Sequence, residues 1–157
     1  MRAVKGLKES VKGFLKMTGH FADSAVYLAE HGYDDEYMRL LGAECESAGS
    51  QKEQAEGMAL TAQGLLFRGQ LRDALKAFEE TDISKLNRSV GHVFVNNYIF
   101  CLFLLNKPER IRTIYEEQNK LALSEGSLFM RRTIGIKEYI EKRYENAVTV
   151  FVKLLSE

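Results

Sequence analysis

Histidine and cysteine side chains are the residues in this sequence that could hold a metal ion. His20, His92, Cys45 and Cys101 could in principle contribute ligands. None of them recurs at a ligand spacing such as Cys-x-x-Cys or His-x-x-x-His, which would bring two donors to one side of a turn or helix. We therefore expect the histidines near helix starts, the cysteines as small apolar residues, and no metal or other cofactor.

Adjacent acidic residues could act as a general acid and a general base. The pairs are Asp34-Asp35, Glu79-Glu80 and Glu116-Glu117. They fall on predicted helices or at helix starts, where such pairs are typical of solvated faces rather than of catalytic sites. The sequence also lacks a Gly-Lys-Ser or Gly-Lys-Thr phosphate-binding loop. We therefore predict that the chain is not an enzyme.

Charge and apolar content narrow the classes of partner. The 22 basic and 22 acidic side chains cancel, so the chain has no net field that would attract nucleic acid. The richest apolar run, from Tyr98 to Leu105, is much shorter than the roughly 18 residues of a membrane span. The two cysteines do not form a disulfide framework, which favours a reducing, cytoplasmic setting.

A repeated segment indicates the elements that must position any functional residue. It runs from Gly69 to Phe78, from Asn106 to Tyr115 and from Lys142 to Phe151, so that successive copies begin 37 and 36 residues apart. A period of this length is typical of helical-repeat arrays, in which each unit buries its apolar face against its neighbours. The sequence therefore predicts an all-α protein.

The repeats divide the chain into helical hairpins within a single domain, residues 1–157. We expect hairpins at about 19–48, 53–82, 89–121 and 126–156, because helical apolar stripes flank each turn. Residues 1–17 are expected to form a helix that caps the first hairpin. Because Lys5, Lys8, Lys12 and Lys16 line this helix, an amphipathic helix that binds a membrane surface or an acidic partner is the alternative.

Two units resemble those of the tetratricopeptide repeat family. The matching residues in the first are Ala62, Leu65, Gly69, Leu71, Ala74 and Phe78, and those in the last are Ile134, Gly135, Tyr144, Ala147 and Phe151. The middle unit departs from the pattern, with Ile99 and Ile111 at small positions. The resemblance implies a right-handed α-α superhelix that acts as a protein–protein interaction scaffold, with the first helix of each hairpin lining a concave groove.

In such a groove, a bound peptide or protein segment would meet the outward-facing residues of the first helices. These residues are Gln63, Phe67, Asn96, Asn97, Phe100, Phe103, Arg132, Ile136 and Tyr139. Aromatic rings supply contact area and polar groups fix a segment, although Phe100 and Phe103 could equally be ordinary core residues. A groove role predicts that Arg132→Ala or Asn96→Ala weakens partner capture without changing thermal stability. A small-molecule ligand in the groove is a further alternative.

The last predicted helix is apolar over more than one stripe. Val148, Val152 and Leu155 lie where a terminal unit should be polar. We therefore expect these three residues to be covered by a second copy in a homodimer, by a partner protein, or by further residues of a longer chain. The alternative function is an assembly subunit that oligomerises through this helix.

Overall fold

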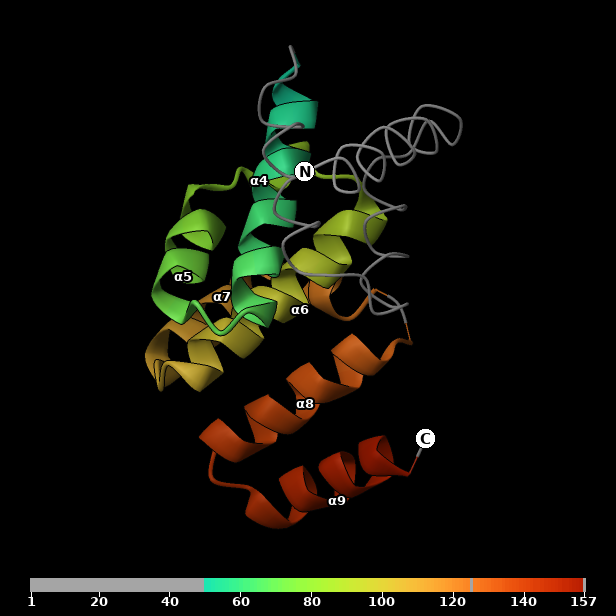
Figure 1. Ribbon diagram of the computed structural model, residues 1–157. Coiled ribbons are helices and arrows are strands. Elements are labelled where there is room, and N and C mark those ends of the chain that lie inside the picture. Colours follow the sequence, from blue (N-terminus) through green and yellow to red (C-terminus); the bar gives the residue numbers. More distant parts are fainter. Residues whose placement is uncertain (1–49, 125, 157) are drawn as a thin grey trace.

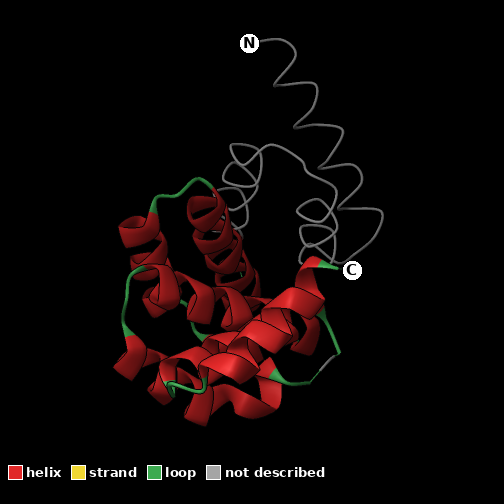
Figure 2. Ribbon diagram, turned by 90° about the horizontal axis from the view of Figure 1, so that it is seen from below, coloured by secondary structure: helices red, strands yellow, loops and turns green. Residues whose placement is uncertain are grey.

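The computed structural model describes residues 50–124 and 126–156, and this part of the chain is helical without a strand (Figures 1 and 2). Its elements are α4 (Gln51–Phe67), α5 (Leu71–Glu80), a 3₁₀ turn η1 (Ile83–Lys85), α6 (Arg88–Leu104), α7 (Pro108–Ala122), α8 (Leu128–Ile140) and α9 (Tyr144–Leu155). The expectation of an all-α protein is confirmed for these residues. The expected capping helix (1–17) and first hairpin (19–48) lie outside the described residues.

The helices form three consecutive hairpins, α4–α5, α6–α7 and α8–α9, joined by the same kind of turn. Two residues after the end of each first helix lies a residue with positive φ: Gly69 (74°), Asn106 (53°) and Lys142 (62°). In each turn the next backbone N–H donates to the carbonyl five residues earlier, as in Gln70 to Leu65 (3.0 Å), Lys107 to Leu102 (2.9 Å) and Arg143 to Glu138 (2.9 Å). This is the Schellman motif. The repeated segment of the sequence therefore corresponds to a repeated turn.

Side-chain caps begin the first helices of the second and third hairpins. The Oδ1 atom of Asn87 accepts a hydrogen bond from the Val90 N–H (2.9 Å), and the Oγ atom of Ser127 accepts one from the Met130 N–H (3.2 Å). Such caps satisfy N–H groups that have no partner inside the helix and stabilise it by about 1 kcal/mol. They set the starts of α6 and α8, and hence the positions of the side chains that these helices carry.

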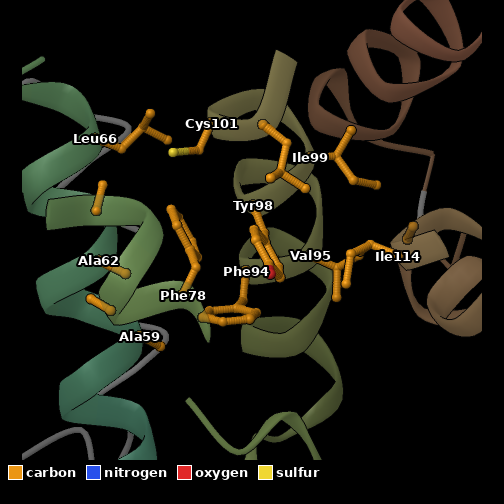
Figure 3. Close-up of a cluster of buried hydrophobic side chains, with 14 of the residues drawn as sticks. Ala59, Ala62, Leu66, Phe78, Phe94, Val95, Tyr98, Ile99, Cys101 and Ile114 are labelled. Atoms are coloured by element: carbon orange, nitrogen blue, oxygen red, sulfur yellow. The ribbon is translucent and has the colours of Figure 1, made fainter. Parts of the chain in front are cut away.

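Helix α6 lies at the centre of the described residues and is buried continuously from residue 90 to residue 99. It contacts α4, α5, α7 and α8. On the side facing α4 and α5, Phe78 stacks on Tyr98 with ring centroids 5.3 Å apart, and Phe94 meets Phe78 edge-on at 5.1 Å (Figure 3). Such aromatic pairs add about 0.5–1.5 kcal/mol each beyond area burial. The first two hairpins therefore share an aromatic core.

The third hairpin is held by a close approach between α8 and α9. Gly135 on α8 faces the ring of Phe151, and a Cβ atom at this glycine would lie 2.6 Å from Cε1 of Phe151. The first helices also contact one another in order, α4 with α6 and α6 with α8, and α9 lies at the outer edge of the described part (Figure 1). The missing side chain of Gly135 thus sets how closely the last two helices pack.

We predict that Gly135→Ala destabilises the protein. Alanine in a helix interior is normally favoured over glycine by about 1 kcal/mol, but the overlap with Phe151 costs about 1–3 kcal/mol. The free energy of unfolding, measured by urea denaturation, should therefore fall by up to about 2 kcal/mol.

Gly126→Ala is the matched control, because no atom lies within 4 Å of the added carbon. Its unfolding free energy should stay within about 0.5 kcal/mol of the unsubstituted protein. If Gly135→Ala unfolded at an equal or higher urea concentration, the close packing of α8 on α9 would be disproved.

Candidate functional site

Arg132 on α8 gathers several of the expected groove residues around its guanidinium group. The Nη2 atom donates hydrogen bonds to Asn97 Oδ1 (2.7 Å) and to the Asn96 carbonyl (3.4 Å), both on α6. The guanidinium carbon lies 4.1 Å from the ring centroid of Phe100 and 5.5 Å from that of Phe129. Four of the residues expected on the groove are therefore brought together at the contact between α6 and α8.

The positive charge of Arg132 has no carboxylate partner among residues 50–124 and 126–156. Burial lowers the pKa of the guanidinium to about 10, so the group remains protonated at neutral pH. Two nearby donors, Nε of Arg132 and Nδ2 of Asn97, are buried without a hydrogen-bond partner in this part of the chain. An unmet buried donor costs about 1–3 kcal/mol. A carboxylate beside the guanidinium would offset this charge, whereas the Asn97 amide is completely buried.

Asn96 is completely buried between α6, α7 and α8. Its Nδ2 atom donates to the carbonyls of His92 (2.7 Å) and Ala122 (3.1 Å), and its Oδ1 atom accepts a hydrogen bond from the Thr133 hydroxyl. Every one of these partners belongs to the protein itself. Asn96 therefore holds three helices together, whereas its place in the sequence suggested a side chain that faces a ligand.

The other expected groove residues differ in exposure. Gln63 on α4 is buried, and its Nε2 atom has no hydrogen-bond partner in the described residues, whereas Phe67 at the end of α4 is 43% exposed. Ile136 on α8 is buried in the hydrophobic core. The groove set is thus split between core positions and surface positions.

Phe103 and Tyr139 belong to a row of three aromatic rings at the turn ends of the second and third hairpins. Their centroids are 5.6 Å apart, and Tyr139 lies 5.5 Å from Tyr144 of α9. Together with Asn106, Lys107, Lys142 and apolar neighbours they line an open cleft of about 280 Å³. Both tyrosines are about half exposed. This cleft is therefore accessible to a partner.

The residues expected at an oligomer interface are exposed on α9. Val148 and Val152 are each 59% exposed and Leu155 is 89% exposed. Tyr144 extends the same stripe, because residues 144, 148, 152 and 155 share one face of a helix. Burial of a contiguous apolar stripe of this kind lowers the free energy, so the stripe is a candidate contact surface.

The remaining reactive side chains are held in the interior. Burial raises the pKa of the Cys101 thiol to about 11, so it is not a thiolate nucleophile at neutral pH. His92 Nδ1 lies 3.0 Å from the Leu121 carbonyl, and Nε2 lies 2.6 Å from Ser127 Oγ, so both ring nitrogens are occupied. His20 and Cys45 lie outside the described residues. Within the described part, no group of acidic, histidine or cysteine side chains is arranged to hold a metal ion, and no helix is long and apolar enough to cross a membrane.

The sequence did not predict that Lys107, Lys142 and Tyr144 line a single cleft. The available signal was the turn position itself, where Lys142 occupies the place of Gly69 and Asn106. A lysine at a position that favours glycine or asparagine points to a role for the side chain.

Comparison of the chain with protein-family models, curated proteins and solved structures finds no match. A functional proposal therefore depends on the residues and the geometry alone.

We predict that Asn96→Ala lowers the free energy of unfolding by about 2–4 kcal/mol, because the buried Thr133 hydroxyl and the Ala122 carbonyl at the end of α7 both lose their Asn96 partner. Asn119→Ala, at an exposed position of α7, is the control and should change stability by about 0.5 kcal/mol or less. Guanidinium denaturation followed by circular dichroism measures both. Equal stability of Asn96→Ala and Asn119→Ala would show that Asn96 does not hold the helices together.

Proposed function

We propose that this chain is a non-enzymatic protein-interaction module that binds a peptide or protein segment. In this proposal the hairpins continue the tetratricopeptide-like pattern as a right-handed superhelix, and α4, α6 and α8 line its concave groove. The repeated turns and the ordered contacts of α4 with α6 and of α6 with α8 support the arrangement. A cytoplasmic location is part of the proposal, because Cys101 is a free thiol.

The single observation that carries the proposal is the unpaired charge of Arg132. Its guanidinium lies over Phe100, and its Nε atom and the Asn97 Nδ2 atom lack acceptors in the described residues. A carboxylate of a bound segment would accept charge-assisted hydrogen bonds from this fork and offset its desolvation. The geometry thus favours an acidic group of a partner at the junction of α6 and α8.

Arg132→Lys should weaken capture of the partner by several-fold, because lysine keeps the charge but loses the planar fork. The measurement is affinity capture from lysate, with each captured protein quantified by mass spectrometry against the unsubstituted chain. Arg72→Lys, at an exposed position of α5, is the matched control and should capture the same proteins in the same amounts. Capture that does not change in Arg132→Lys would count against a binding role for the α6–α8 junction.

A second candidate function, assembly through α9, is favoured by the exposed stripe of Tyr144, Val148, Val152 and Leu155. The equivalent of Val148 in the preceding hairpin, 36 residues earlier, is Arg112. The Nη2 atom of Arg112 donates to the Ile140 carbonyl (3.1 Å), and its Nε atom pairs with Glu141 (3.1 Å), both in the following hairpin. In α7 this face therefore packs against the hairpin that follows it. In α9 the equivalent face is apolar and exposed.

If α9 joins two copies, the purified chain should be dimeric, and Val148→Glu with Val152→Glu should make it monomeric, because two charges would be buried in an apolar contact. Multi-angle light scattering over a range of concentrations measures the mass. Thr149→Glu with Lys153→Glu is the control, since both positions are exposed with the same spacing but lie beside the stripe. A monomeric unsubstituted chain at high concentration would remove the basis of this candidate.

A further inference from the structure

The cleft at the turn ends of the second and third hairpins has the size and lining of a receptor for one large apolar side chain. It contains about 280 Å³, less than the usual volume of a pocket for a drug-sized ligand. The rings of Phe103, Tyr139 and Tyr144 meet edge-on along it, and Tyr139 and Tyr144 keep about half their surface exposed. Aromatic faces of this kind supply most of the binding energy at protein interfaces.

The rim of this cleft carries an excess of positive charge. Lys107 and Lys142 line it and are exposed. In the part of the chain that the structure describes, no carboxylate lies within ion-pair distance of either amino group. Of the acidic side chains near these lysines in the sequence, Glu109 and Glu141 pair with Arg112, and Glu138 pairs with Arg143. Glu145 is exposed and makes no ion pair among the described residues. The two lysines are therefore available to carboxylates of a partner.

The backbone at Lys142 provides an independent indication. Its φ of 62° is in the left-handed region, where a non-glycine residue is strained, and the equivalent turn positions carry Gly69 and Asn106, the residue types that tolerate this conformation best. A side chain kept at a strained position on the rim of a cleft is an indication of function.

We infer that this cleft binds an acidic protein segment, which places one large apolar side chain in the cleft against Phe103, Tyr139 and Tyr144 while flanking carboxylates meet Lys107 and Lys142. The inference rests on the proposed function, because it names the chemistry of the segment that the interaction module binds. Aromatic rings and lysines can also receive a nucleic-acid base and its phosphates. The cleft offers two lysines, whereas nucleic-acid affinity depends on many phosphate contacts, and this favours the acidic segment.

The test is a titration of the ¹⁵N-labelled full chain, followed by NMR chemical shifts. The probe is a pentapeptide, acetylated and amidated at its ends, with phenylalanine flanked on each side by two glutamates. The amide signals of Tyr139, Lys142 and Tyr144 should shift saturably. The same peptide with alanine at its centre should bind about ten-fold more weakly, and the peptide with lysines as flanks should give no saturable shift.

Lys142→Gly separates binding from folding, because it removes a charge and relieves the backbone strain at once. The melting temperature should rise by about 2 °C, while the affinity for the acidic peptide should fall roughly two- to five-fold. Lys120→Ala is the matched control, since it removes one exposed positive charge from α7 outside the cleft. It should leave the affinity for the acidic peptide unchanged.

Three outcomes would overturn the inference: unchanged affinity in Lys142→Gly, equal binding of the lysine-flanked peptide, or stronger shifts of the same amides by a uridine hexanucleotide than by the peptide. Arg132→Lys distinguishes this failure from a failure of the proposed function. If the acidic peptide does not bind but Arg132→Lys still lowers partner capture, the interaction module stands and its acidic ligand at the cleft does not.

Discussion

The buried amide of Asn96 is the interaction on which the arrangement of the second and third hairpins depends. Helix α6 is enclosed by four neighbouring helices, so a polar side chain in its middle must find partners within the protein. Asn96 does so by bonding to its own helix, to the end of α7 and to Thr133 of α8. Each bond has a directional requirement. An apolar contact would tolerate a shift of one helix along the other, whereas the hydrogen bonds of Asn96 specify where α8 lies along α6.

The position of α8 in turn places the candidate functional groups. Thr133 and Arg132 are adjacent, so the bond that holds Thr133 also directs the neighbouring guanidinium over Phe100 and toward Asn97. Two turns further along α8, Tyr139 meets Phe103 of α6 and Tyr144 of α9. The position of α8 along α6 thus determines both the surroundings of Arg132 and the aromatic cleft. The proposed binding surface is built from residues on packed helices, and such preorganisation lowers the entropic cost of association.

The sequence predicted the elements of the described part well and the environment of individual side chains poorly. Turns are encoded locally: the segments that begin at Gly69, Asn106 and Lys142 each end one helix and start another within a few residues. The surroundings of α6 are not local, because the partners of Asn96 lie up to 37 residues away. Periodicity assigns Asn96 to one face of a helix, but it does not show that further helices enclose that face. The sequence contains the lysines and aromatic residues of the cleft, but it does not show that they lie together. They come together only because three helices pack against one another.

The two sides of α6 differ in chemistry, and this difference has a thermodynamic consequence. Toward α4 and α5 the contact is made by stacked rings, Phe78, Phe94 and Tyr98, whereas toward α8 it includes the amides of Asn96 and Asn97 and the guanidinium of Arg132. Exposure of apolar surface raises the heat capacity, and exposure of polar surface lowers it. Separation of the first pair of hairpins should therefore carry a larger heat-capacity increment than separation of the second. The stability of the two junctions would then change differently with temperature. The aromatic junction of α6 with α4 and α5 should depend on temperature more strongly than the polar junction of α6 with α8.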